Sequence, residues 1–207
     1  MIIAVDGPAA SGKGTLARRL AAELGLAYLD TGKIYRAVGY RVLAEGGDPA
    51  DPEAAQAAAE KLNESDLANP ALAGDDAADA ASKVAAIDTV RATLLAFQQH
   101  VAATPPGAVL DGRDIGTVVC PRADVKLFIT ADVETRADRR HKELLDRGET
   151  SIYARVLQAL VDRVARDPSR SAGPWEASED VIIIELTPMD AAAAFNTAIG
   201  ITRSRPS

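Results

Sequence analysis

Nine residues near the start of the chain, Gly7–Thr15, combine the residue types that bind phosphate. The glycines let backbone N–H groups curl round an anion because no side chain blocks its approach, and Lys13 adds a full positive charge that reaches outer phosphates. The usual pattern has Ser or Thr directly after the lysine, whereas here Gly14 intervenes and Thr15 carries the hydroxyl. The residues expected to hold phosphate are Gly7, Pro8, Ala9, Ala10, Ser11, Gly12, Lys13, Gly14 and Thr15.

The residues on either side predict the elements that position this loop. Ile2–Asp6 is an apolar run typical of a buried strand, and the leucines at 16, 20 and 24 predict a helix that ends at Gly25. A helix N-terminus adds partial positive charge to an anion site. The alternative, a chance turn rich in Gly and Lys, is disfavoured because strand and helix are both in place. The Gly-Lys-Gly-Thr ending resembles that of nucleoside monophosphate kinases.

A second group of charged residues, Asp111–Asp114, follows the apolar run Ala108–Leu110. Two carboxylates and a guanidinium at the end of a buried strand are costly unless a ligand uses them. We expect Asp111 to serve the Mg²⁺ shell, Arg113 to clamp a phosphate and Asp114 to accept from an exocyclic amine of a base. The alternative is an internal Arg–Asp pair that stabilises a turn.

Arginines are concentrated late in the chain, where they suit the charge that spreads over a migrating phosphoryl group. Anion contact is expected for Arg136, Arg139, Arg163, Arg166 and Arg170. Arg140 is left open, while Arg147 and Arg155 are assigned to solvated helix faces that pair with acidic neighbours.

Strands that alternate with helices predict an α/β fold with a five-stranded, doubly wound parallel sheet. The expected strands are residues 2–6, 27–29, 108–110, 125–129 and 181–184, and the expected helices after the first are 34–45, 51–63, 79–86, 89–103, 133–147, 151–165 and 188–199. Residues 64–76 are expected to be a loop because they hold turn formers and few apolar residues. Ligands bind at the carboxyl ends of such strands, which places Thr31, Tyr35 and Arg36 near the phosphate loop.

Length and composition limit the class of protein. A chain of 207 residues suits one sizeable α/β domain, with room for a small mobile subdomain. The net charge of −7 argues against non-specific binding to nucleic acid or membrane. The single Cys120 excludes an internal disulfide framework and fits a reducing cytoplasm. The N-terminus is apolar for only five residues, which predicts neither a signal peptide nor a membrane anchor.

Several blocks together resemble the bacterial cytidylate kinase family, and they occur in the family's order along the chain. They are Asp6–Leu16, Leu29–Arg36, Ala81–Arg91, Asp111–Val119, Val125–Phe128 and the Arg166-Asp167…Arg170…Pro174 segment. The phosphate loop alone indicates only a nucleotide user, whereas the Asp-Gly-Arg-Asp block with the Thr-Gly…Tyr-Arg block points to this family.

The resemblance implies a three-layer P-loop kinase fold with a mobile lid, and transfer of the γ-phosphate of ATP to CMP or dCMP. It implies that Thr15 approaches Mg²⁺, with Asp111 acting mainly through water. The implied acceptor-phosphate clamp is Arg36, Arg113 and Arg163; the cytosine readers are Ser82, Arg91 and Asp114; the ribose contacts are Asp167 and Arg170. Arg136 is expected at ATP, and the catalytic set is Lys13, Asp111, Arg113, Arg139 and Arg166.

The chain departs from the family pattern at three places. The insert before the Ala81 block is shortened, and Leu72–Gly74 stands where the family has an Ile-Arg-Thr run, so one phosphate-facing arginine is missing. Lys33 replaces a small residue beside the acceptor site, where its charge suits that loss. Val164 replaces the first aspartate of an Arg-Asp-x-x-Asp pattern.

The sequence therefore predicts a cytoplasmic, monomeric (d)CMP kinase of one domain that uses ATP with Mg²⁺. The expected core is about 1–45, 87–135 and 180–207, the acceptor-binding insert about 46–86 and the lid region about 136–175. Two alternatives stay open: a P-loop kinase for another small acceptor such as UMP, and a nucleotide-binding module without catalysis.

Overall fold

Five apolar runs form one sheet in the computed structural model, which describes residues 1–166 and 180–204. The strands are β1 (Ile2–Asp6), β2 (Ala27–Asp30), β3 (Ala108–Gly112), β4 (Val125–Thr130) and β5 (Val181–Glu185), in the spatial order β2-β3-β1-β4-β5. β1 pairs in parallel with β3 and β4, and β4 pairs in parallel with β5. The predicted α/β fold with a five-stranded parallel sheet is confirmed.

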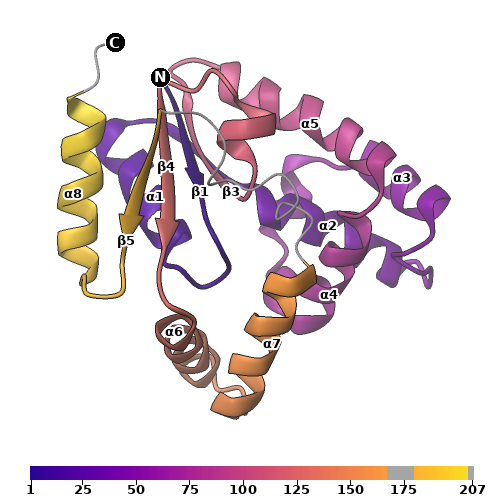
Figure 1. The fold of residues 1–207 in the computed structure, drawn as a ribbon. Helices are drawn as coiled ribbons and strands as arrows, with labels where there is room; N and C mark the ends of the chain where they lie inside the picture. Colours follow the sequence, from indigo (N-terminus) through magenta and orange to yellow (C-terminus); the bar gives the residue numbers. More distant parts are fainter. Residues whose placement is uncertain (167–179, 205–207) are drawn as a thin grey trace. The chain divides into compact units, whose positions relative to one another are not determined.

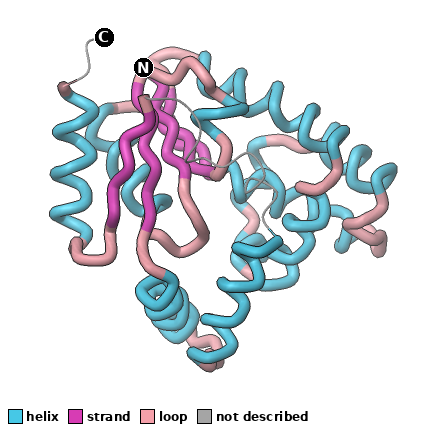
Figure 2. Tube along the Cα trace, viewed as in Figure 1, coloured by secondary structure: helices cyan, strands magenta, loops and turns pink. Residues whose placement is uncertain are grey.

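The register of the central strands decides which loops meet. Asp6, the last residue of β1, lies opposite Gly112, the last residue of β3. The residues that follow, Gly7 and Arg113, therefore leave the sheet from neighbouring strands at its carboxyl edge. Helices α1 (Lys13–Leu24) and α8 (Ala191–Arg203) pack on one face of this sheet (Figures 1 and 2).

Side chains along β1 point alternately to the two faces of the sheet, so each face packs against different elements. Ile3 and Val5 join the apolar core with Leu20 of α1 and Phe195 of α8. The alternate residues Ala4 and Asp6 point to the other face, where the short π-helix η3 (Ile115–Val119) contacts β1. The sequence pattern did not predict η3. Helices α6 (Val133–Asp146) and α7 (Tyr153–Arg166) follow β4 and pack against each other.

The chain divides into two compact units, which are residues 1–28 with 105–207 and residues 29–104. The second unit is helical: α2 (Thr31–Ala44), α3 (Pro52–Glu60), α4 (Asp75–Val84) and α5 (Asp88–Ala103). Gly39 brings α2 close to α4, since a Cβ there would lie 2.7 Å from Cβ of Ala80. The expected insert of about 46–86 falls inside this unit; its role and that of the expected lid stay predictions.

The predicted loop over residues 64–76 is wrong in part. Two 3-10 helices, η1 (Glu64–Ala68) and η2 (Pro70–Ala73), occupy it, and α4 begins at Asp75, four residues earlier than expected. The side chains of Asn63 and Asn69 accept from the N–H groups of Ser65 and Ala71, so residues taken as turn formers serve here as helix caps. Asp51 caps α3 with Pro52 at its first position, as predicted.

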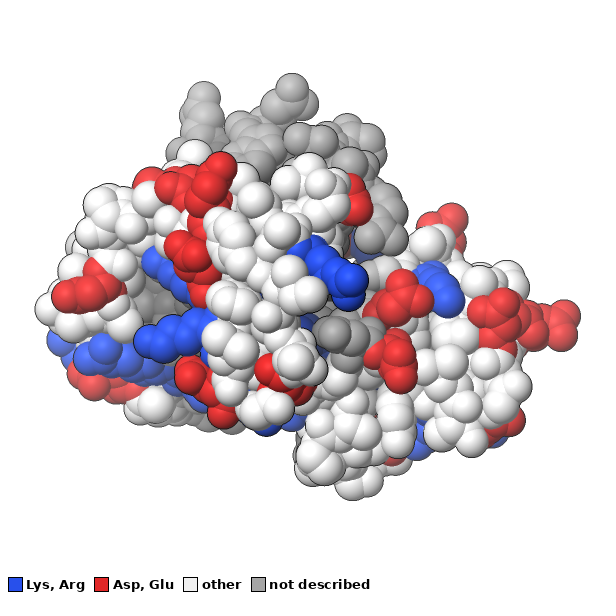
Figure 3. Space-filling view, turned by 90° about the horizontal axis from the view of Figure 1, so that it is seen from below, with Lys and Arg blue, Asp and Glu red and all other residues white. Residues whose placement is uncertain are grey.

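Two further observations concern the surface. None of the helices among residues 1–166 and 180–204 has the length and apolar content needed to cross a membrane. Figure 3 shows basic and acidic side chains mixed over the face that it views.

Candidate active site

The phosphate loop leaves β1 in a conformation that its glycines permit. Gly7 and Gly12 have φ angles of 151° and 97°, and Ala10 also has a positive φ of 60°. A Cβ on Gly7 would lie 2.1 Å from the carbonyl oxygen of Ile129 in β4, so no other residue fits there. Gly12 is the N-cap of α1, which begins at Lys13. The loop therefore ends at a helix N-terminus, as predicted.

Two arginines of α6 hold this loop from outside. Arg139 donates from Nη1 to the carbonyl of Ser11 at 2.8 Å and from Nη2 to the carbonyl of Leu186 at 2.9 Å. Arg136 is buried, and it donates to the carbonyls of Ala131 and Ala9 at 3.1 and 3.3 Å. Burial lowers the pKa of Arg136 from its ordinary value. Both side chains thus lie at the loop, while their contact with phosphate stays a prediction.

Asp111 lies beside the start of α1. Its carboxylate is buried, with Oδ1 at 3.4 Å from Nζ of Lys13 and Oδ2 accepting from the Tyr28 hydroxyl at 2.9 Å. Thr15 is exposed in the first turn of the same helix. The structure therefore brings together an ammonium and a carboxylate that lie about a hundred residues apart in the sequence. Tyr28 had no predicted role, because nothing in the sequence links β2 to Asp111.

These groups fit a Mg²⁺–nucleotide complex. A Cβ on Gly14 would lie 2.8 Å from Oδ2 of Asp111, so the glycine keeps space open beside the carboxylate. The Ser11 hydroxyl is buried and has no hydrogen-bond partner among the described residues. The described residues also contain no cluster of three or more His, Cys, Asp or Glu side chains suited to a metal. The Asp111 carboxylate with the Thr15 hydroxyl suits Mg²⁺, because this ion keeps several of its waters and binds mainly through substrate phosphates.

Asp6 is a site residue to which the sequence assigned no role. Its carboxylate is buried and accepts from the backbone N–H groups of Ile115 and Gly116, both at 2.8 Å. Burial raises the pKa of Asp6 to about 6, against the opposite effect of these two hydrogen bonds. The available signal was an acidic residue at the end of an otherwise apolar strand.

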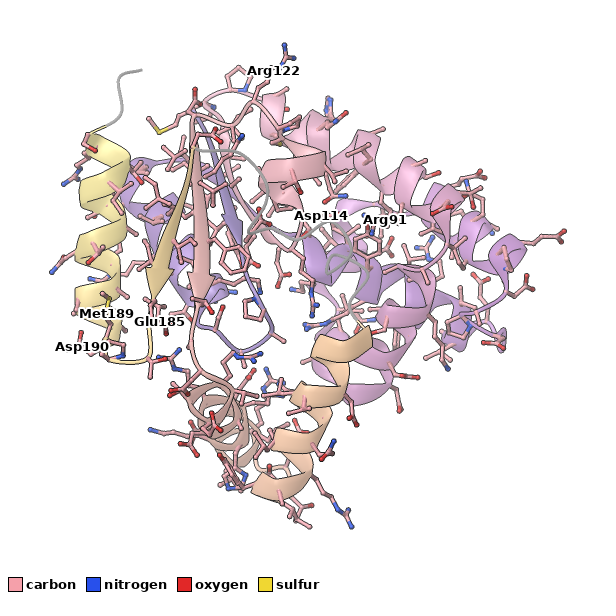
Figure 4. The ribbon with its side chains drawn as sticks, viewed as in Figure 1. Arg91, Asp114, Arg122, Glu185, Met189 and Asp190 are labelled. Carbon is pink, nitrogen blue, oxygen red and sulfur yellow. The ribbon has the colours of Figure 1, made fainter. Side chains whose placement is uncertain are left out.

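The turn after β3 carries Arg113 and Asp114, which are both half-buried. The carbonyl of Asp114 accepts from the N–H groups of Val118 and Val119 at 2.8 and 3.2 Å, which closes the turn into η3. Figure 4 labels Asp114 and Arg91, which come from different compact units. The expected roles of Arg113 and Asp114 stay predictions, as does the alternative of an Arg–Asp pair.

The remaining acceptor residues lie on helices of the second unit. Thr31 is the buried first residue of α2, Arg36 is half-buried on the same helix, and Arg91 is half-buried on α5. Ser82 is exposed on α4 and donates to the carbonyl of Ala78 at 3.2 Å. Lys33 donates its backbone N–H to Asp30, the N-cap of α2. The parts assigned to these residues in binding an acceptor stay predictions.

The late arginines fall into distinct environments. Arg140 of α6 and Arg147, the C-cap of α6, both pair with Glu143, so the surface pairing predicted for Arg147 is confirmed. Arg155 is exposed on α7. The backbones of Arg163 and Arg166 belong to the end of α7. Asp167 and Arg170, the expected ribose contacts, lie outside the described residues.

Comparison with solved structures supports the fold. The chain superposes on an uncharacterized protein from Eubacterium ventriosum with a TM-score of 0.58 at 15% sequence identity, covering 99% of both chains. A gluconokinase from Sinorhizobium meliloti gives a TM-score of 0.52 at 15% identity, covering 98% of this chain and 91% of that one. At these identities the likeness concerns the fold alone.

Sequence relatives are much closer. A cytidylate kinase of Paramagnetospirillum magneticum is 57% identical over 207 residues, which cover 99% of this chain and 98% of that protein. A cytidylate kinase of Methylocella silvestris is 52% identical and covers 99% of this chain and 94% of that protein. The family model for cytidylate kinase matches residues 3–203. The chain therefore belongs to the cytidylate kinase family.

Proposed function

We propose that this chain transfers the γ-phosphate of ATP to CMP or dCMP, giving ADP and (d)CDP, as a monomeric cytoplasmic enzyme of pyrimidine nucleotide metabolism. The observation that carries the proposal is the donor side of the site: a glycine loop at a helix N-terminus, with Lys13 3.4 Å from the buried Asp111. Membership of the cytidylate kinase family, whose model matches residues 3–203, supports CMP or dCMP as the acceptor.

The donor side binds and orients ATP. Backbone N–H groups of Gly7–Thr15 surround its phosphates, and Lys13 neutralises part of their charge. Asp111 and Thr15 are the residues that would hold Mg²⁺, which when bound offsets charge on the β- and γ-phosphates. Arg136 and Arg139 hold the loop through the carbonyls of Ala9 and Ser11. Arg166 is proposed to stabilise the migrating group.

The acceptor side positions a nucleophile that is already charged. A phosphate oxygen of CMP attacks the γ-phosphorus, and the bond from that phosphorus to the bridging oxygen of ADP breaks. The attacking oxygen is anionic at pH 7, so positioning and electrostatics supply most of the rate. The proposed contacts are Arg36, Arg113 and Arg163 at the acceptor phosphate, Ser82, Arg91 and Asp114 at cytosine, Asp167 and Arg170 at the ribose, and Thr31 beside them.

An acceptor panel tests this function. ADP release is measured in a coupled assay with CMP, dCMP, UMP, AMP and shikimate at the same ATP and Mg²⁺ concentrations. We expect kcat/KM for CMP or dCMP to exceed that for every other acceptor. Faster turnover of UMP or AMP rejects the cytosine assignment, and ATP binding without transfer to any acceptor rejects catalysis. The panel also shows whether Ala73, which stands where the family has an arginine, has changed the acceptor.

A pair of variants tests whether Asp114 recognises the cytosine base. Asp114→Asn removes the carboxylate proposed to accept from the amino group of cytosine, so kcat/KM should fall more for CMP than for UMP, by about tenfold. Asp124→Asn is the matched control, because Asp124 accepts from the N–H of Ile2 at the amino end of β1, the end opposite to the site. Equal losses with CMP and UMP exclude Asp114 from reading the base.

A further inference from the structure

Asp6 joins two loops that the sheet already places next to each other. It is the last residue before the phosphate loop, and it lies opposite Gly112 at the end of β3. Its Oδ1 accepts from the N–H of Ile115 and its Oδ2 from the N–H of Gly116, at 2.8 Å each. The carboxylate therefore spans from the donor loop to the start of η3.

Arg113 and Asp114 are held between these contacts. Gly112, on one side of them, is fixed by the pairing of β3 with β1, and Ile115, on the other side, is fixed by Asp6. A two-residue segment with both ends fixed has little freedom to change its backbone. The N–H groups of Ile115 and Gly116 open a helical turn, where N–H groups need acceptors from outside the helix, and a buried carboxylate meets two of them.

We propose that Asp6 is a positioning residue that fixes Arg113 and Asp114 relative to the phosphate loop, and so sets the distance between donor and acceptor. The inference rests on the proposed function in that Arg113 and Asp114 face the acceptor. A purely structural role for Asp6 predicts a loss of stability alone. A positioning role predicts a selective rise in KM for the acceptor, with KM for ATP little changed.

Two variants disturb the contact from its two sides. Asp6→Asn keeps the size of the side chain, but its amide NH₂ faces an N–H group and cannot accept from it. Gly116→Ala leaves Asp6 intact, while its Cβ would lie 3.3 Å from Oδ2 of Asp6 and from Cγ of Lys126. The second variant keeps the test valid where the first fails to fold. Asp124→Asn is the control, since it makes the same substitution at a carboxylate that accepts from the backbone at the far end of β1.

The experiment measures KM and kcat for CMP and ATP, together with hydrogen exchange of the Ile115 and Gly116 amides. Both variants should raise KM for CMP about tenfold, change KM for ATP less than about twofold and speed exchange at these two amides. The control should leave all three unchanged. Unchanged KM for CMP in both variants, or an equal rise in KM for ATP, overturns the inference. A wild-type enzyme inactive on CMP contradicts the proposed function instead, and the same comparison is then made with the acceptor that the panel identifies.

Discussion

The Tyr28 hydroxyl donates a 2.9 Å hydrogen bond to Oδ2 of Asp111, while Nζ of Lys13 lies 3.4 Å from Oδ1. Both oxygens of one buried carboxylate are thus held, by a residue of β2 and by the first residue of α1. The carboxylate lies beside an ammonium, and these two contacts fix its orientation. This arrangement suits a carboxylate that helps to hold a cation beside phosphate. If the carboxylate rotated, it would lose its contact with Lys13.

Tyr28→Phe should lower kcat about tenfold and raise the Mg²⁺ concentration for half-maximal rate, because a hydrogen bond to a charged group is lost. The ring remains, and with it the contact with the Arg18 guanidinium, 5.1 Å from the ring centroid. The assay varies free Mg²⁺ at saturating ATP and CMP. Tyr40→Phe, the same deletion on α2, is the control. A Mg²⁺ dependence equal to that of wild type would show that the hydroxyl does not position Asp111.

Gly14→Ala should reduce kcat/KM for ATP at least a hundredfold while the protein still folds. The new methyl group would lie 2.8 Å from Oδ2 of Asp111 and 3.7 Å from the Tyr28 hydroxyl, so the carboxylate has to move. Gly200→Ala in α8 is the control, because nothing lies within 4 Å of its Cβ, and it should keep activity and gain about 0.5–1 kcal/mol in stability. Circular dichroism verifies the fold of both variants, and activity within twofold of wild type in Gly14→Ala contradicts the expectation.

The donor side was largely predictable because its signals are local. A short apolar run, a glycine-rich turn and leucines every fourth residue fix β1, the loop and α1 within 24 residues. The roles of Tyr28 and Asp6 were not predictable, because their partners lie 83 and 109 residues away and meet them only through the pairing of parallel strands. Sequence spacing carries no information on such contacts.

Residue type also left two ambiguities that only packing resolves. A guanidinium can donate to a phosphate or to a backbone carbonyl, so the residue type could place Arg136 and Arg139 at an anion site without showing that they hold Ala9 and Ser11. Asn and Pro favour turns, but they also begin helices. Residues 64–76 therefore read as a loop although Asn69 caps η2 and Pro70 begins it.

The ion pair between Lys126 and Asp180 provides a test of stability. Lys126 is 7% exposed in β4 and its Nζ lies 2.9 Å from Asp180, which is 48% exposed. Asp180→Asn leaves a buried ammonium poorly compensated and should lower the free energy of unfolding by about 1–3 kcal/mol. Adding Lys126→Met should recover most of that loss, because an apolar side chain of similar length needs no partner.

Urea denaturation of the single and double variants measures these free energies. The control is Lys83→Met, which removes an exposed pair with Asp79 one helical turn away and should change stability by less than about 0.5 kcal/mol. A double variant no more stable than Asp180→Asn would show that the loss does not come from the unpaired charge.

Asp6 should make stability depend on pH in an unusual direction. Its pKa of about 6 in the folded protein lies above the ordinary value of 3.8, so the folded state binds the proton more tightly than the unfolded state between these values. The contribution of Asp6 is therefore fully present below pH 3.8 and is lost as pH rises through 6, by up to about 3 kcal/mol. Nearby Asp114 acts in the same direction as burial, and Lys13 opposes it.

Urea denaturation of wild type and Asp6→Asn from pH 4 to 7 at constant salt tests this sign. The free energy of unfolding of wild type minus that of the variant should shrink as pH rises, since the amide of the substituted side chain takes up no proton. Asp132→Asn is the control, because hydrogen bonds from Thr135 lower the pKa of Asp132 below its ordinary value of 3.8, so its contribution is lost only below that pH and its difference should stay constant from pH 4 to 7. A difference for Asp6→Asn that stays constant, or grows with pH, would show that the two N–H bonds outweigh burial and keep Asp6 ionised throughout.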